Sequence, residues 1–272
     1  MSVASPLLDH VDPVIRLVPD SGLKQALKNS FAMEAESVAK IERFFARLPE
    51  QKWSQDLLSC VFNSWKATHL KMLAIYGLSC RLQRLADSAI NGHELSLLSA
   101  AAKNAETSHE DLGLDFDGHT HADLYDSFAG TFVAEDWQLK RHRLDSASRF
   151  SKWVYRNMVV EDIQVGLFTN MFSEIYNHGE YSTALPSFNA YVDNHCDLGP
   201  KEKARALMYI SAHIEDETEI AHFQVVLDSL DLYLKGTDEQ LNYELAERVF
   251  RQYLKGVAPV MQELTERMST EA

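Results

Sequence analysis

Three groups of glutamate and histidine residues are the part of this sequence that could do chemistry. The first lies in residues 104–125 and contains Glu106, His109, Glu110 and His119. The second is a pair of glutamates in a long apolar segment, Glu161 and Glu174. The third lies in residues 212–223 and contains His213, Glu215, Asp216, Glu217, Glu219 and His222. A carboxylate that faces a protein core is unstable unless it is paired, protonated or bound to a cation, so groups on neighbouring helices could be stabilised together by metal ions.

The types of ligand in these groups indicate which metal they would hold. Carboxylates and imidazoles without thiolates favour iron or manganese, and helical bundles commonly hold two such ions between bridging glutamates. A single Glu-x-x-His motif is more often a solvated helix face, but three groups in one chain favour a metal centre. The sequence contains no GxGxxG, GxxxxGK, GxSxG, HExxH or EF-hand motif that would indicate another chemistry.

The remaining histidines are expected to lie outside the site. His69 is in an apolar stretch and is predicted to be a hydrogen-bonded core residue. No role in the site is predicted for four others, His121, His142, His178 and His195.

The elements that would position these residues are predicted to be helices. Apolar residues recur at three- and four-residue steps, strand-like alternation is almost absent, and no proline lies between Pro49 and Pro186. The pattern predicts an all-α bundle of about seven to eight helices. The main helices are expected at residues 21–48, 51–87, 94–110, 119–133, 145–177 and 200–235, with a last one after residue 237 that Pro259 should bend or break. Residues 181–198 are predicted to be mostly a connection.

Length and composition limit the organisation and the partners. The chain has 272 residues, of which 46% are apolar and 24% charged, typical of a globular protein. We expect an N-terminal extension in residues 1–20 and a single helical domain in residues 21–272. The net charge of −14 argues against nucleic acid and anionic membranes as partners. Three scattered cysteines indicate a reducing compartment, and the lack of a signal peptide or membrane-spanning run predicts a cytoplasmic protein.

A ferritin-like di-iron bundle is one way to build the centre. It would use Glu106-x-x-His109 and Glu219-x-x-His222 together with one glutamate from each of two other helices. One of these glutamates should lie near residue 75, but residues 57–86 contain no acid. This scheme therefore lacks a ligand, unless a much earlier residue such as Glu34 or Glu36 supplies it, and it ranks second.

The other way resembles a known family, the haem-oxygenase-like di-iron oxidases and oxygenases. The resemblance covers roughly residues 20–235 and depends on the order acid, glycine, histidine in the first group, on Gly166-Leu-Phe-Thr-Asn-Met-Phe-Ser-Glu174, and on the late helix rich in acids and histidines. It implies a haem-oxygenase-like single-domain bundle. The metal ligands that it implies are Glu110, His119, Glu174, His213, Glu217 and His222. The alternatives are Glu106, His109, Glu161, Glu215, Asp216 and Glu219.

The third group departs from the family pattern. His213 and His222 are nine residues apart, which places them on opposite sides of a regular helix. Either one ligand is missing or the helix is distorted, for example by a π-bulge. The second metal position is therefore expected to be the weaker one.

The resemblance also implies an activity. In the family, two ferrous ions and O2 oxidise a small amino-acid-like or fatty-acid-like molecule by N-oxygenation, hydroxylation or oxidative C–C cleavage, in some cases with an external electron donor and in a homodimer. We expect Tyr125, Trp153, Phe168, Phe172 and Tyr209 to line the substrate site. Two alternatives are a metal-free enzyme of the same fold, thiaminase-like or acting in cofactor biosynthesis, and a non-catalytic helical binding protein.

Overall fold

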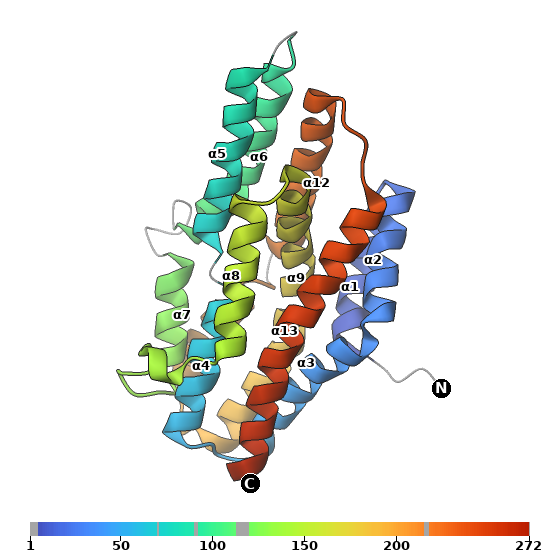
Figure 1. The fold of residues 1–272 in the computed structure, drawn as a ribbon. Helices are drawn as coiled ribbons and strands as arrows, with labels where there is room; N and C mark the ends of the chain where they lie inside the picture. The colour runs from blue at the N-terminus through green and yellow to red at the C-terminus, as the bar shows by residue number, and fades with distance from the viewer. Residues whose placement is uncertain (1–4, 70, 90–91, 113–119, 215–217, 272) are drawn as a thin grey trace.

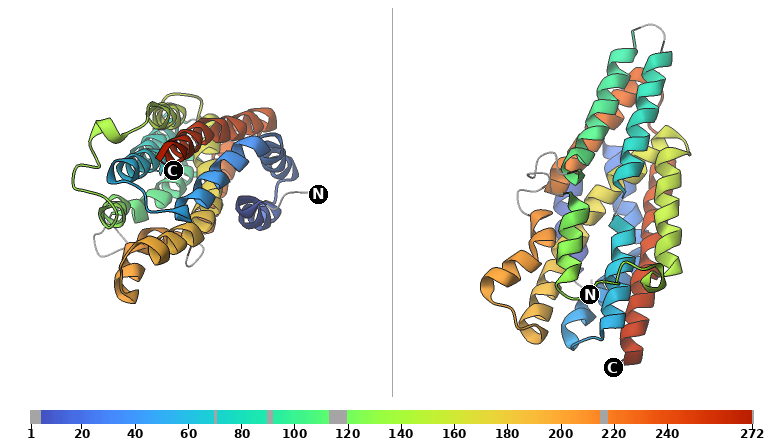
Figure 2. Two further views of the ribbon diagram at one scale, coloured as in Figure 1. Left: turned by 90° about the horizontal axis from the view of Figure 1, so that it is seen from below. Right: turned by 90° about the vertical axis from the view of Figure 1, so that its left-hand side faces the viewer.

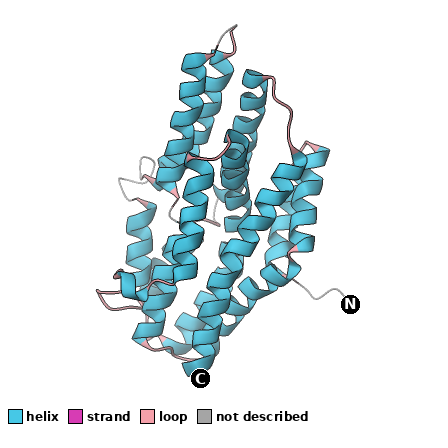
Figure 3. Ribbon diagram, viewed as in Figure 1, coloured by secondary structure: helices cyan, strands magenta, loops and turns pink. Residues whose placement is uncertain are grey.

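The protein is all-α, as the sequence predicted. The computed structural model describes residues 5–69, 71–89, 92–112, 120–214 and 218–271, and every regular element in these ranges is helical (Figure 3). They contain thirteen α-helices and two short 3-10 helices, more than the seven to eight predicted. None of the described helices combines the length and the apolar character needed to cross a lipid bilayer.

The centre of the bundle is the helix α9 (Ile163–His195), which is buried on all sides from Gly166 to Ala184. The α-helices with the most extensive contact to it are α1 (Pro6–Leu17), α8 (Asp145–Val159), α12 (Thr218–Thr237) and α13 (Tyr243–Glu271). Figures 1 and 2 show α9 enclosed by the other helices. A helix with apolar residues on every face is typically buried, because it has no continuous polar face to present to water.

Two groups of helices complete the bundle around this centre. On one side, α5 (Met72–Ser88) and α6 (Glu94–Asp111) pack against each other and α6 packs on α12 (Figure 1). On the other side, α2 (Ser21–Met33) and α3 (Ala35–Arg47) pack on α13. The remaining elements are η1 (Leu48–Glu50), α4 (Gln55–His69), α7 (His121–Gly130), η2 (Lys140–His142), α10 (Pro200–Ala206) and α11 (Met208–Ala212).

Most of the extra helices arise where a long predicted helix is interrupted. The segment 21–48 is divided at Glu34, and the segment 145–177 is divided between Val159 and Ile163. The segment 200–235 is divided into α10, α11 and α12, and His213 lies in the turn that ends α11. Apolar periodicity continues across such short breaks, because the two helices that flank a break bury the same side of the chain, so periodicity alone does not locate them.

The prediction that residues 181–198 form a connection is wrong, because α9 continues to His195. The helix predicted at residues 145–177 stops two residues before Gly179, but Gly179 is a close-packing position inside α9. A Cβ atom at Gly179 would lie 2.5 Å from Val11 Cγ2 and 3.1 Å from Leu7 Cγ. The glycine lets α1 approach α9. Pro186 and Pro259 likewise lie inside α9 and α13 without ending them.

The described part of the N-terminal segment contains a helix that packs in the bundle. Residues 6–17 form α1, which begins with Pro6 in the first turn and a cap from the Ser5 side chain. Its apolar face is buried against α9 and consists of Leu7, Val11, Val14 and Ile15. This helix is part of the hydrophobic core.

Candidate metal centre

A small polar pocket lies where α9 passes the α4–α5 junction, α7 and the α11–α12 junction. Its volume is about 30 Å³, enough for about two water molecules. The charged or imidazole side chains that line it are His69, Lys71, His121, Glu174, His213, Glu219 and His222. The other lining residues include Thr107, Asn177, Tyr181 and Tyr209. Ionisable groups from several helices and helix junctions therefore converge on one buried point.

Three of these residues could hold a metal ion together. Ligand atoms of Glu174, Glu219 and His222 all lie within 4.8 Å of one another, and each residue is more than nine-tenths buried. His222 Nδ1 is 3.8 Å from Glu174 Oε2. Glu219 and His222 lie one turn apart on α12, so both point toward the same face of α9. This is the arrangement that a Glu-x-x-His motif provides when its helix is buried.

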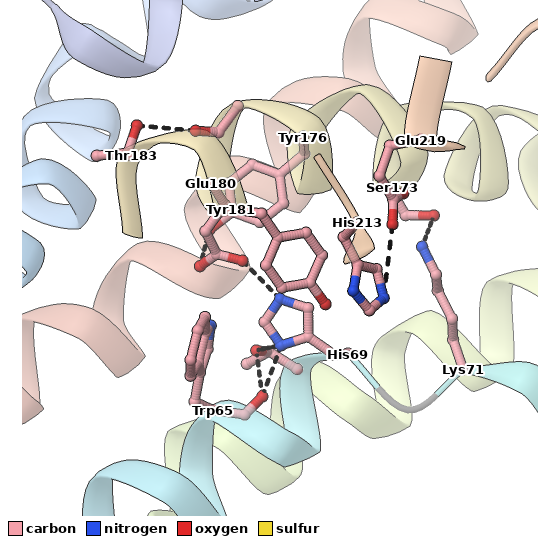
Figure 4. Close-up of polar contacts among 12 residues, drawn as sticks. Trp65, His69, Lys71, Ser173, Tyr176, Glu180, Tyr181, Thr183, His213 and Glu219 are labelled. Atoms are coloured by element: carbon pink, nitrogen blue, oxygen red, sulfur yellow. Dashed lines mark hydrogen bonds and ion pairs between the residues drawn. The ribbon is translucent and has the colours of Figure 1, made fainter. Parts of the chain in front are cut away.

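His213 is oriented toward the same group by its backbone. Its Nδ1 atom lies 2.5 Å from the carbonyl oxygen of Tyr209, which can only accept, so Nδ1 carries the proton. The other ring nitrogen, Nε2, then faces Glu219 Oε1 at 3.8 Å, as Figure 4 shows. The break between α11 and α12 resolves the predicted conflict, because His213 and His222 are not on one regular helix and both reach the pocket.

Among the described residues that line the pocket, Lys71 is the one lysine or arginine, and it is 8% exposed. Its ammonium lies 3.1 Å from Glu174 Oε1 and donates to the Ser173 hydroxyl, a contact also seen in Figure 4. A buried lysine is costly unless it is paired, and this pairing gives Glu174 a fixed positive neighbour. Lys71 could not be predicted as a site residue, because a lone lysine has no local sequence pattern that marks it.

His69 contacts the pocket but is engaged in a separate network. Its Nδ1 donates to the carbonyl of Trp65 at 2.8 Å, and its Nε2 lies 2.6 Å from Glu180 Oε2 (Figure 4). The other oxygen of Glu180 accepts a hydrogen bond of 2.7 Å from Tyr176. Both ring nitrogens are thus occupied by protein groups, in agreement with the prediction of a core histidine. Glu180, which is fully buried, was missed because it lies beyond residue 177, where the predicted helix ends.

Aromatic rings close one wall of the pocket around His213. The rings of Tyr181, Tyr209 and His121 have centroids 4.4, 4.6 and 4.6 Å from the His213 ring. The hydroxyls of Tyr181 and Tyr209 are hydrogen-bonded at 2.7 Å. Burial holds the pKa of Tyr181 well above its usual value, so this side chain is a neutral phenol. His121, for which the sequence predicted no role, belongs to this wall.

The predicted ligands divide into four groups by where they lie. The structure brings together Glu174, His213, His222 and the alternate Glu219. It places Glu106 and His109 on the exposed face of α6, where Glu106 pairs with Lys103 at 2.9 Å. It places Glu161 in the α8–α9 connection, paired with Arg156 at 2.6 Å. His119, Glu215, Asp216, Glu217 and the side chain of Glu110 lie outside the described residues.

The positions on α6 follow from which of its faces is buried. Asn104, Thr107 and Ser108 are buried, and Thr107 lines the pocket, so the helix turns Glu106 and His109 toward solvent. The ferritin-like scheme therefore loses its first Glu-x-x-His motif.

Of the five residues predicted to line a substrate site, Tyr209 lines the pocket. Tyr125 lies behind it, with ring centroids 4.9 Å apart, and donates to the carbonyl of Phe62. Trp153 lines a separate groove between α8 and α13. Phe168 and Phe172 pack against Phe250 in the core. On a regular helix, Phe172 and Phe168 point about 160° and 120° away from Glu174. Because α9 is buried on all sides, these directions lead to other helices.

An apolar cavity of about 270 Å³ adjoins the polar pocket. The two share Lys71, Met72 and Ala122, and the apolar residues that line the rest include Ala67, Leu73, Ala74 and Val154. Leu73 and Tyr155, at its outer side, are 74% and 51% exposed. The cavity offers space for an apolar group next to the polar pocket. None of the three cysteines, all among the described residues, lines either cavity.

Comparison with known proteins identifies the fold. No protein-family model matches the chain, and no curated protein matches its sequence. Among solved structures, it is similar to a TenA homolog from Pseudomonas syringae pv. tomato, with a TM-score of 0.59 and 14% identity over 91% of this chain and 93% of that one. It is also similar to a domain of unknown function with a heme oxygenase-like fold from Shewanella denitrificans, with a TM-score of 0.60 and 13% identity over 93% and 95%. The chain therefore has the haem oxygenase-like fold.

Proposed function

We propose that this protein is a non-haem iron oxidase or oxygenase that uses O2 to oxidise a small organic substrate. The observation that carries this proposal is the group Glu174, Glu219 and His222, whose ligand atoms lie within 4.8 Å of one another in a buried pocket. A second iron, as in the di-iron enzymes that the sequence resembles, would need ligands beyond this group.

The donor set fits iron. Two carboxylates and an imidazole, with His213 close by and no thiolate, are ligands that suit non-haem iron or manganese. His213 presents Nε2 to this group because its Nδ1–H is bound to a backbone carbonyl, which is the usual outer support of a metal-binding histidine. Lys71 offers one fixed positive charge near the two carboxylates, and a bound cation would supply the remaining positive charge that balances them.

Bound iron would supply the reaction with O2. The chain's own residues would hold the metal and control access to it. The rings of Tyr181, Tyr209 and His121 exclude water from one side of the pocket. Met72 and Ala122 separate the pocket from the apolar cavity, so a substrate with an apolar portion could place that portion in the cavity and its reacting end beside the ligands.

A metal-free enzyme is the second candidate, and the pairing of Lys71 with Glu174 favours it. This pairing stabilises Glu174 without a metal, at 3.1 Å. The similarity to a TenA homolog is compatible with such an enzyme, in which the glutamates and histidines would act as acids, bases or binding groups. The two candidates differ in their response to a chelator, since the metal-free activity would survive EDTA.

Metal retention tests the proposal. The chain is loaded with Fe(II) without oxygen, desalted and analysed for iron, and O2 is then added while absorption and O2 consumption are recorded. We expect at least one iron per chain and a transient visible absorption after O2 is added. A chain that retains no iron and remains colourless would refute the proposal.

A further inference from the structure

The two oxygens of Glu174 face two different positive or metal-binding partners. Oε2 lies 3.8 Å from His222 Nδ1, on the side of the candidate metal ligands. Oε1 lies 3.1 Å from the Lys71 ammonium. In a two-metal carboxylate site, a bridging glutamate gives one oxygen to each ion. Here the ammonium is next to the oxygen that a second ion would need.

The position of the Lys71 ammonium is fixed by its surroundings. The side chain is 7% exposed, and the residue precedes α5, where its carbonyl accepts from the backbone N–H groups of Ala74 and Ile75. The ammonium also donates to the Ser173 hydroxyl, which in turn donates to the carbonyl of Asn170 at 2.6 Å. Figure 4 shows Lys71 extended from the α4–α5 junction toward α9. A charge held in this way cannot simply turn into solvent when a metal ion approaches.

We propose that Lys71 occupies the second cation position of this centre, so that the chain binds one divalent ion tightly and a second one only weakly. The inference rests on the proposed metal-dependent function. Two positive charges that share one carboxylate in a buried site repel each other strongly, since the effective dielectric there is far below that of water. Lys71 therefore determines the metal stoichiometry, because its ammonium neutralises the Glu174 oxygen that a second ion would bind.

The experiment is a titration of the metal-free chain with Mn²⁺ at one pH, read by electron paramagnetic resonance and by metal analysis after dialysis. We expect one tight equivalent in the wild-type chain, with the spectrum of an isolated ion. In Lys71→Met, we expect the second equivalent to bind at least about tenfold more tightly and to give a magnetically coupled pair. Lys71→Arg keeps the charge and should keep one equivalent. Lys66→Met is the matched control, because Lys66 pairs with Asp126 away from the pocket.

The possible outcomes separate this inference from the proposed function. A wild-type chain that binds no ion refutes the proposed function, and the inference with it. Two equally tight ions in the wild-type chain support a metal enzyme and overturn the role of Lys71. A single equivalent in Lys71→Met also overturns it. If Lys71→Met does not fold, Lys71→Gln replaces it, and thermal unfolding with and without Mn²⁺ identifies variants that fold only with metal. If neither folds, the wild-type stoichiometry decides, with one ion supporting the inference and two overturning it.

Discussion

Glu174 on α9 and His222 on α12 face each other across 3.8 Å, with Glu219 completing a buried group of three. The site therefore depends on the packing of α9 against α12, two helices that share an extensive contact. Neither helix could form the site alone, since α9 supplies one of the three residues and α12 supplies the other two.

Removing a ligand should abolish tight iron binding. In His222→Ala and in Glu219→Gln, we expect the affinity for Fe(II) to fall at least about tenfold. Loss of a residue that only supports a metal ligand already lowers metal affinity by about tenfold or more, and loss of the ligand itself should cost at least as much. Equilibrium dialysis under nitrogen measures this. His93→Ala is the control, because His93 lies 3.7 Å from Asp238 and outside the pocket. Equal iron binding in all four chains would remove the basis for a metal centre.

The pair of His69 and Glu180 should contribute strongly to stability. Both side chains are almost fully buried and 2.6 Å apart, so removing one leaves the other without its partner. We expect Glu180→Leu to lower the free energy of unfolding by about 3–5 kcal/mol. Urea unfolding of the two single variants and of His69→Leu/Glu180→Leu gives the coupling between them, and the double variant should lose less than the sum. The exposed pair of Lys103 and Glu106 is the comparison, and breaking it should change little. Additive losses at the buried pair would contradict this account.

The buried tyrosines should make the protein unstable in alkali. Burial raises the pKa of Tyr125, Tyr176, Tyr181 and Tyr253 well above the ordinary value of 10. Above pH 10 the unfolded chain loses these protons while the folded chain keeps them, so stability is complete below pH 10 and falls as the pH rises further. The absorbance of tyrosinate near 295 nm should therefore appear together with loss of helical circular dichroism. Ionisation of all ten tyrosines at about pH 10 in a chain that stays folded would show that these side chains are accessible.

Two glycines provide a matched test of close packing. Gly179→Ala would place a methyl group 2.5 Å from Val11 Cγ2, and we expect a loss of about 1–3 kcal/mol as α1 is pushed from α9. Gly130→Ala adds a methyl group to open space at the end of α7, and should be close to neutral. Chemical unfolding of both variants measures the difference. Equal stability would mean that α1 does not depend on this approach.

The sequence was informative where a residue contrasted with its neighbours. Glu174 is the one acid in an apolar run, and His222 lies among apolar residues of a periodic helix, so both could be recognised without a structure. The helical class followed from periodicity. The residues that were missed have no such contrast. Lys71 reaches the site from a helix junction, and Glu180 lies beyond a glycine whose role is to admit α1.

Orientation was the other missing information. Phe168 and Phe172 lie close to Glu174 in the chain but point to α13, because a helix that is buried on every side has no preferred face for its apolar residues. A sequence pattern can identify which residues of such a helix are buried, but not which neighbour each one meets.

The length of α9 also determines how the protein can tolerate change. The helix carries Glu174 and Glu180, six residues apart, and these serve two polar networks on different sides of the helix. Sliding or rotating α9 to adjust one network would disrupt the other, and a one-residue insertion between them would turn one carboxylate by about 100° into an apolar neighbour. The helix must therefore remain fixed during any working cycle. Any rearrangement that admits a substrate or a metal ion then has to leave both of these carboxylates in place.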